Sequence, residues 1–284
     1  MMVSAVWSGL TRVWVTVTYA VILFCVTTTL SALGPIAAGR VFQQASTNLH
    51  NLNHGHVGTL LGSAFVVDAG PPYLWLPGLI CLMAVAELLW RSRRLVVAFA
   101  VGHIGATLLV AVGLTAAVKL GALPVSITRA EDVGMSYGAT AILGTLTGAV
   151  PTRWRASWIG GCLAVGASVA WASSDFTDVG HAVALVLGMV VATRFGEPGP
   201  WTATRVVLVA VGAPFGFLIL ANTTPLMVVA TICGVSGALL GALVGWLWRS
   251  MRRAREAPAL ATGPSAVRIP VGRPGPVSGG SVRS

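Results

Sequence analysis

The sequence predicts an all-α polytopic membrane protein with eight transmembrane helices. Two features of the composition lead to this class: only 9% of the 284 residues are charged, whereas 55% are hydrophobic. A soluble domain usually has about 25% charged residues, so this chain lacks the residues for a water-facing surface. The third observation is a series of eight apolar stretches, each near the roughly 20 residues that a helix needs to cross a bilayer.

The eight predicted spans cover residues 13–34, 73–90, 95–119, 134–150, 156–173, 179–194, 204–222 and 225–248. The first resembles a signal peptide, but its apolar run is longer than the 7–15 residues typical of one, so we expect a retained helix. The stretch 57–67 is too short to span, and we expect an interfacial or re-entrant element. The turn at 222–224 is very short, which predicts an antiparallel transmembrane hairpin over residues 196–249.

Arginine placement predicts the orientation of these helices. If the N-terminus lies inside, the outer side carries only three basic residues, Arg40, Lys119 and Arg129. The positive-inside rule therefore places both termini in the cytoplasm, in the plasma (inner) membrane, with residues 35–72 as an external loop. It also explains the net charge of +10 better than a nucleic-acid partner, which we do not expect. Residues 250–284 are expected to form a disordered basic cytoplasmic tail.

Several polar residues have simple structural explanations. The four cysteines all fall in apolar stretches, which suggests neither a disulfide framework nor a zinc site. The external histidines have metal-like spacing, but no acidic or cysteine partner lies nearby, so a polar loop explains His50, His54 and His56. We expect His103 to make a structural hydrogen bond, and Glu87 to form an ion pair with Arg91, Arg93 and Arg94.

A serine and a histidine are the candidate catalytic residues. Ser136 and His181 each lie about one turn below the outer start of their helices, a rise of roughly 5 Å, so they share one depth. A serine becomes a nucleophile when a histidine within hydrogen-bond reach takes its proton. The alternative is ordinary helix packing. Asp175 and Asp178 flank the histidine and either orient it or cap the helix, and capping is the simpler reading.

Small residues at helical spacing predict close contact between these two helices. Gly134 and Gly138 lie four residues apart on one, and Gly180, Ala184 and Gly188 are spaced by four on the other. Small side chains let membrane helices approach closely. We therefore expect Gly134, Gly138, Ala184 and Gly188 to face the interface.

In these features the chain resembles the rhomboid intramembrane serine proteases over about residues 13–195. Gly134-Met135-Ser136 matches the family's serine motif on the fourth helix, and His181 with Ala184 and Gly188 matches its sixth. Further likenesses are Ser63-Ala64-Phe65 before the second helix and Glu87 near that helix's end. The resemblance implies a six-helix core over residues 1–195, to which the hairpin at 196–249 is an addition.

The resemblance implies a protease that cleaves transmembrane substrates near the outer membrane face with a Ser136–His181 dyad and no metal or organic cofactor. The family's helix-two histidine and asparagine are absent from Tyr73–Pro77, and an aromatic residue that usually contacts the histidine is replaced by Thr140. The remaining oxyanion donors are backbone N–H groups near Gly134 and Tyr137 and the Tyr73 hydroxyl. The alternative function is an inactive rhomboid-like protein that binds the transmembrane helices of client proteins. An ion-coupled transporter ranks third, because apart from Glu87 no acidic residue lies in a span.

Overall fold

The structure is a computed structural model that describes residues 11–173 and 175–261. The first long helix, α2 (Trp14–Leu33), is followed by three short helices and a 3₁₀ turn: α3 (Pro35–Ala45), α4 (Leu49–Asn53), α5 (Thr59–Gly62) and η1 (Ser63–Phe65). The predicted external loop is thus largely helical. Ser63 and Ala64 in η1 are buried, so this segment folds back into the helical bundle.

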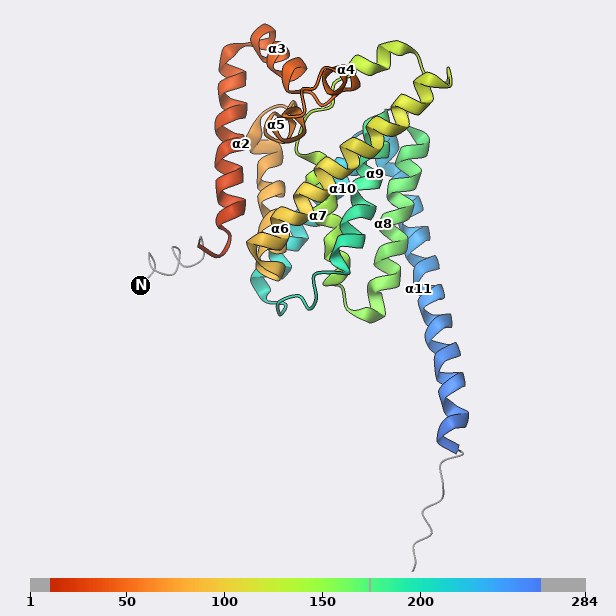
Figure 1. Ribbon diagram of the computed structural model, residues 1–284. Helices are drawn as coiled ribbons and strands as arrows, with labels where there is room; N and C mark the ends of the chain where they lie inside the picture. Colours follow the sequence, from red (N-terminus) through yellow and green to blue (C-terminus); the bar gives the residue numbers. More distant parts are fainter. Residues whose placement is uncertain (1–10, 174, 262–284) are drawn as a thin grey trace, which may run out of the picture. The chain divides into compact units, whose positions relative to one another are not determined.

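The second and third predicted spans form one kinked helix, α6 (Pro72–Lys119). The kink lies at Arg91, whose backbone is left-handed (φ 70°, ψ 160°). Figure 1 shows the chain reversing there, from the orange to the yellow part of α6. The two spans are therefore joined without an intervening loop.

The centre of the bundle is α7 (Ser136–Thr145), which continues into η3 (Leu146–Gly148). Every residue from Tyr137 to Thr145 is buried. The helix packs against α6 and against α9 (Phe176–Ala192), while α8 (Thr152–Ala172) packs on the other side of α9. Ser136, the first residue of α7, is therefore the partly exposed end of an otherwise buried helix.

Two further helices, α10 (Ala203–Leu220) and α11 (Thr224–Ala261), follow the core and are joined by a short turn. On α10, Gly212 faces the backbone of Leu82, and Phe215 lies where a side chain at Gly78 would stand, so α10 packs on α6. On α11, Gly237 faces the backbone of Gly160, so α11 packs on α8. Each added helix is thus anchored to a different helix of the core.

The chain divides into two compact units, residues 1–245 and 246–284. The predicted tail was expected to be disordered from residue 250, but α11 continues to Ala261. Residues 251–257 are rich in alanine and arginine, which favour helix, and this explains the extension past residue 250, although Pro258 farther along does not favour it. The rest of the predicted tail, residues 262–284, lies outside the described residues.

The protein is a helical membrane protein. Among the described residues, four helices are long and apolar enough to cross a bilayer: α2, α6, α10 and residues 225–253 of α11. The helix α9 is apolar but shorter, at 17 residues. The count of eight spans, with α6 crossing twice and the short α7 enclosed, stays a prediction.

The predicted ion pair of Glu87 is wrong. Its buried carboxylate accepts hydrogen bonds from the Thr16 backbone N–H (2.9 Å) and hydroxyl (2.6 Å), from the Val15 N–H (3.1 Å) and from the Ser92 hydroxyl (2.6 Å). The carboxylate thereby satisfies free N–H groups at the start of α2 and bridges the kink at Arg91. These donors saturate the carboxylate, which leaves the neighbouring arginines to solvent or lipid headgroups.

Candidate functional site

The external segment holds the start of α7 through backbone hydrogen bonds. The Gly134 N–H donates to the Ser63 carbonyl (2.9 Å), and the Thr47 N–H donates to the Asp132 carbonyl (3.0 Å). The Asp132 N–H in turn donates to the Ser46 hydroxyl (2.8 Å). Gly134 has a φ of +118°, which a residue with a side chain rarely adopts. The chain is thus turned and fixed two residues before Ser136.

His181 lies one turn inside α9 and is buried, with 6% of its surface exposed. Neither of its ring nitrogens has a hydrogen-bond partner among the described residues. The nearest charged group is the buried Asp178 carboxylate, 3.5 Å from the histidine Nδ1. The ring of Tyr137 meets the imidazole edge-on, with 5.3 Å between the ring centroids. A buried histidine whose ring makes no hydrogen bond is unusual and calls for an explanation.

Small residues bring α7 and α9 into backbone contact, as the sequence predicts, but not all of the expected ones take part. A side chain at Gly188 would collide with the Ala141 carbonyl, and one at Gly180 with the Tyr137 ring. Ala184 is completely buried beside them. Gly138, by contrast, faces the Phe99 ring of α6, so its predicted place in the α7–α9 interface is wrong.

Gly134 also lies outside that interface. A Cβ atom added at Gly134 would have no atom beyond its own chain neighbours within 4 Å. The stripe of α7 that meets α9 instead runs through Tyr137, Ala141 and Gly144, with Gly144 facing the Leu185 carbonyl. These positions are three and four residues apart, the spacing of one helix face. Gly138 is one residue further along and is therefore rotated by about 100° away from α9.

Ser136 and His181 are carried by adjacent helix starts, but the structure shows no hydrogen bond between them. The serine is partly exposed, while both imidazole nitrogens lack a partner within the described residues. Tyr73 stands apart from them at the start of α6, with 73% of its surface exposed. It lines a hollow of about 850 Å³ together with Glu131, five residues before Ser136.

Comparison with known proteins identifies the architecture. The sequence model of the family described as "Rhomboid-like protein" matches residues 10–195. The chain belongs to the rhomboid-like family. No curated protein and no solved structure matches the chain. The family match ends just after α9, so α10 and α11 lie outside the matched core of this rhomboid-like protein.

The aromatic neighbour of the histidine in this rhomboid-like protein is Tyr137, the residue directly after the serine. The resemblance to the family instead places this aromatic residue at position 140. There Thr140 is buried and donates to the Ser136 carbonyl (2.7 Å). Tyr137 and Thr140 lie on the same side of α7, so a tyrosine one turn earlier takes the place beside the ring. The Tyr137 hydroxyl and the Asp178 Oδ1 are also buried without a hydrogen-bond partner.

Asp132 adds a titratable group at the outer edge of this cluster. Burial raises the pKa of its carboxyl to about 7, and the negative charge of Asp175 adds to the rise. The Tyr137 hydroxyl lowers that pKa somewhat, although it approaches without a hydrogen bond of standard geometry. Asp132 is therefore partly protonated near neutral pH. Asp175 itself caps α9 by accepting from the Thr177 N–H (3.0 Å), as the sequence suggests.

The structure also reveals a second serine–histidine pair, which the sequence did not predict. The Ser63 hydroxyl lies 3.1 Å from the His103 Nε2, and both residues are buried. The Thr47 hydroxyl lies 3.0 Å from the Ser63 hydroxyl and 2.8 Å from the Thr59 carbonyl. Each hydroxyl has one proton to donate, so His103 donates to Ser63, Ser63 donates to Thr47, and Thr47 donates to the Thr59 carbonyl. His103 thus makes the structural hydrogen bond expected of it, and it ties η1 to α6.

The external histidines do not form a metal site with other residues. His54 Nδ1 lies 2.7 Å from the His50 carbonyl, and their rings are 4.3 Å apart. Across the described part of the chain, no group of three or more His, Cys, Asp or Glu side chains is arranged to hold a metal ion.

Proposed function

We propose that this rhomboid-like protein is an intramembrane serine protease that cleaves transmembrane substrates near the outer membrane face. One observation carries the proposal: His181 is buried beside the start of α7, with its Nδ1 3.5 Å from the Asp178 carboxylate and its Nε2 without a partner among the described residues. Leaving buried polar atoms unpaired destabilises a fold, and where such atoms persist a catalytic role is one of the known explanations. An imidazole with a free nitrogen in this place is suited to take a proton from Ser136.

The proposed reaction is an acyl transfer followed by hydrolysis. The Ser136 oxygen attacks the substrate carbonyl while His181 accepts the serine proton, and His181 then donates that proton to the leaving amine. Water, activated by the same histidine, releases the acyl group and restores the serine. Catalytic hydrogen bonds are often long before substrate binds, so a rotation of the Ser136 side chain toward His181 would complete the pair.

The oxyanion would be held by backbone N–H groups at the start of α7. The first N–H groups of a helix have no partner within the helix and carry its positive dipole end, so they favour a developing negative charge. Tyr137 directly follows the serine there, whereas the Gly134 N–H already donates to the Ser63 carbonyl (2.9 Å) and would have to leave it to serve as a donor. The Tyr73 hydroxyl is the remaining candidate donor, and its exposed position requires the start of α6 to close over the substrate.

The second candidate function is a non-catalytic rhomboid-like protein that binds the transmembrane helices of client proteins. Two observations favour it: Ser136 and His181 share no hydrogen bond, and the sequence at Tyr73–Pro77 lacks the family's helix-two donors. Losing one oxyanion donor typically slows catalysis by about 10²–10³-fold. In this case the enclosed α7 would serve only as the centre of a helix-binding scaffold.

In either case we propose a plasma (inner) membrane location with both termini in the cytoplasm, supported by the placement of Arg91, Arg93, Arg94, Arg153 and Arg155 at one end of the helices. The partner would be the transmembrane helix of a substrate or client protein.

Cleavage of a membrane-anchored test substrate by the reconstituted full chain tests the proposal. Ser136→Ala and His181→Ala should each abolish cleavage, and the double variant should be little worse, because the two residues act as a unit. Ser63→Ala should retain cleavage, since its hydroxyl belongs to the structural pair. Cleavage that persists in Ser136→Ala would exclude the dyad. A folded wild type that binds but does not cleave varied helices would establish the second function.

A further inference from the structure

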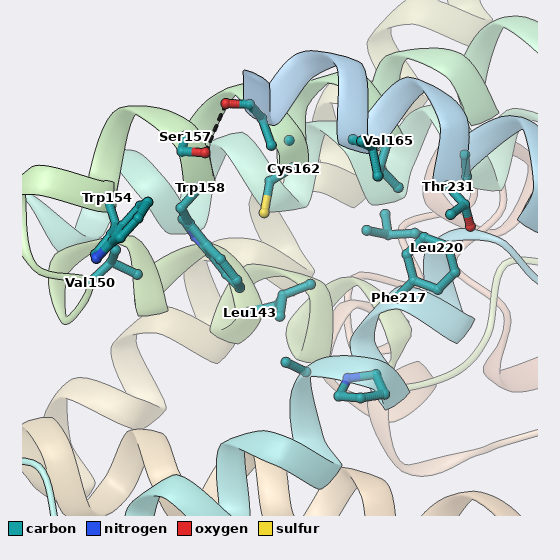
Figure 2. A pocket seen from close by; sticks show the side chains of 17 residues that line it. Leu143, Val150, Trp154, Ser157, Trp158, Cys162, Val165, Phe217, Leu220 and Thr231 are labelled. Carbon is teal, nitrogen blue, oxygen red and sulfur yellow. Dashed lines mark hydrogen bonds between the residues drawn. The ribbon is translucent and has the colours of Figure 1, made fainter. Parts of the chain in front are cut away.

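An apolar groove lies where the added helices meet the rhomboid-like core. It is lined by α8, α10, α11 and the end of α7, has a volume of about 680 Å³, and is open on one side. Figure 2 shows Trp154 and Val150 at one end and Leu220 and Thr231 at the other. The groove belongs to the compact unit of residues 1–245, and part of its wall consists of helices beyond the family's matched core.

The few polar side chains of the groove are already engaged. The Ser157 hydroxyl donates to the Ala238 carbonyl (2.8 Å), the Trp158 Nε1 donates to the Thr147 hydroxyl (3.1 Å), and Thr231 donates to the Met227 carbonyl (2.7 Å). A polar ligand would find few partners there, and burying it would cost free energy. The apolar lining therefore favours binding of a hydrocarbon chain.

The length of the groove fits one membrane leaflet. Along α8 it extends from Trp154 to Val165, eleven residues or about 16 Å at 1.5 Å per residue. Half of a bilayer core of about 30 Å is about 15 Å. A transmembrane helix would need twice this length, whereas an acyl chain from a single leaflet fills it.

The end of the groove at Trp154 is positively charged. The exposed Arg153 guanidinium lies over the Trp154 ring (5.9 Å). The Arg155 guanidinium donates to the Gly148 and Val150 carbonyls (3.2 Å each), and its Nε is buried without a partner. Within the described residues neither arginine forms an ion pair with an acidic side chain. Arginines in this position bind anionic lipid headgroups, and tryptophans favour the headgroup level.

We infer that this groove binds an anionic phospholipid of the cytoplasmic leaflet. One acyl chain lies between α8, α10 and α11, and the headgroup phosphate contacts the exposed Arg153, with Arg155 adding positive charge behind it. The lipid would fill the space between the two added helices and so fasten them to the core. This site is independent of Ser136 and His181.

Native mass spectrometry of the full chain in detergent, titrated with phosphatidylglycerol or phosphatidylcholine, tests the site. The wild type should bind the first phosphatidylglycerol at least five-fold more tightly than phosphatidylcholine. Ala213→Phe, which fills the groove, should remove this preference. The matched control Ala210→Phe, on the same helix but on its exposed face outside the groove, should keep it.

Arg153→Gln should weaken phosphatidylglycerol binding about five-fold, since a basic residue near the surface contributes about 1 kcal/mol. It should weaken phosphatidylcholine binding less, because the choline cation offsets the phosphate charge of that lipid. Arg40→Gln, at the opposite end of the helices, is its control. Equal binding of the two lipids by the wild type would overturn the inference, as would a preference that survives Ala213→Phe. If Ala213→Phe does not fold, the two arginine variants decide the question, because a preference unaffected by Arg153→Gln contradicts the site.

Discussion

Glu87 ties the first helix of the core to the second through a single buried carboxylate. Its four donors come from Val15, Thr16 and Ser92, and two of these residues lie more than seventy positions away in the chain. The sequence places an acidic residue at the end of a span, but it does not show which distant backbone N–H groups meet it. The expected partners were the adjacent arginines, but donors at the start of α2 bind the carboxylate instead.

Replacing Glu87 by alanine should therefore destabilise the fold strongly. The change leaves buried N–H and hydroxyl donors without an acceptor. Hydrogen bonds to a charged group contribute a net of about 1.5–3 kcal/mol each, and bonds that share one carboxylate do not add independently. We expect a loss of roughly 3 kcal/mol in unfolding free energy, measured by thermal or denaturant unfolding in detergent. Glu197→Ala, at an exposed position, should have no measurable effect, and equal stability of the two variants would contradict this role.

Asp132 should make stability depend on pH. Its pKa is about 7 in the folded protein against 3.8 for the free side chain, so the folded state binds the proton more tightly. Stability from this group is then full below about pH 4 and is lost as pH rises through 7. The Tm of the wild type should fall over this range relative to that of Asp132→Asn. Parallel Tm profiles of the two proteins would show that Asp132 titrates normally.

The candidate dyad illustrates what sequence can predict at this scale. Ser136 and His181 are predicted from their depth and from the small residues around them, and the family match covers the residues that carry both. Their rotamers and neighbours were not predictable. Whether Tyr137 or a residue at 140 meets the imidazole depends on the exact rotation of α7, and the Ser63–His103 pair depends on a loop that folds back into the bundle.

At the scale of elements, packing between α7 and α9 depends on glycines that face backbone atoms. Gly188→Leu should lower the unfolding free energy by more than the roughly 1–3 kcal/mol typical of overpacking. The new side chain meets the Ala141 carbonyl, which belongs to the backbone and cannot move aside. Gly138→Leu should cost less, since it meets the Phe99 side chain. Gly113→Leu, in a helix with open space around it, is the control. Melting curves in detergent should rank the variants in this order, and a Gly188→Leu protein as stable as the control would refute the packing.

The small-residue spacing predicted that α7 and α9 touch, but it assigned the wrong face of α7. Two glycine series overlap in that helix, and periodicity alone does not decide which one faces α9. The same limit applies to α6, where two spans were recognised by hydropathy but the direct connection through a left-handed Arg91 was not. Backbone conformation at a non-glycine residue carries no clear sequence signal.

At the scale of the whole molecule, helical membrane character followed directly from composition, and the rhomboid-like family followed from a few motif residues in the right order. The added helices were expected as a pair, but the different core helices that anchor them were not. Their contacts involve glycines of distant segments, such as Gly160 with Gly237. Spacing within one helix does not predict which distant helix a glycine will face.

Topology is testable by chemical labelling. Single cysteines introduced at Gln43 and Ser250, in a background without the native cysteines, should react oppositely with an impermeant thiol reagent. Gln43 should be labelled from outside intact cells, and Ser250 only after the membrane is opened, because arginine placement keeps both termini inside. Labelling of Ser250 from outside would reverse the proposed orientation.

The central claim, that Ser136 is an activated nucleophile, is tested most directly by a serine-directed fluorophosphonate. The purified full chain should be labelled, and peptide mapping should find the adduct on Ser136. Labelling should disappear in Ser136→Ala and His181→Ala but persist in Ser63→Ala, which lacks the buried Ser63–His103 pair. A folded wild type that is not labelled, or an adduct that persists in Ser136→Ala, would contradict the proposed protease.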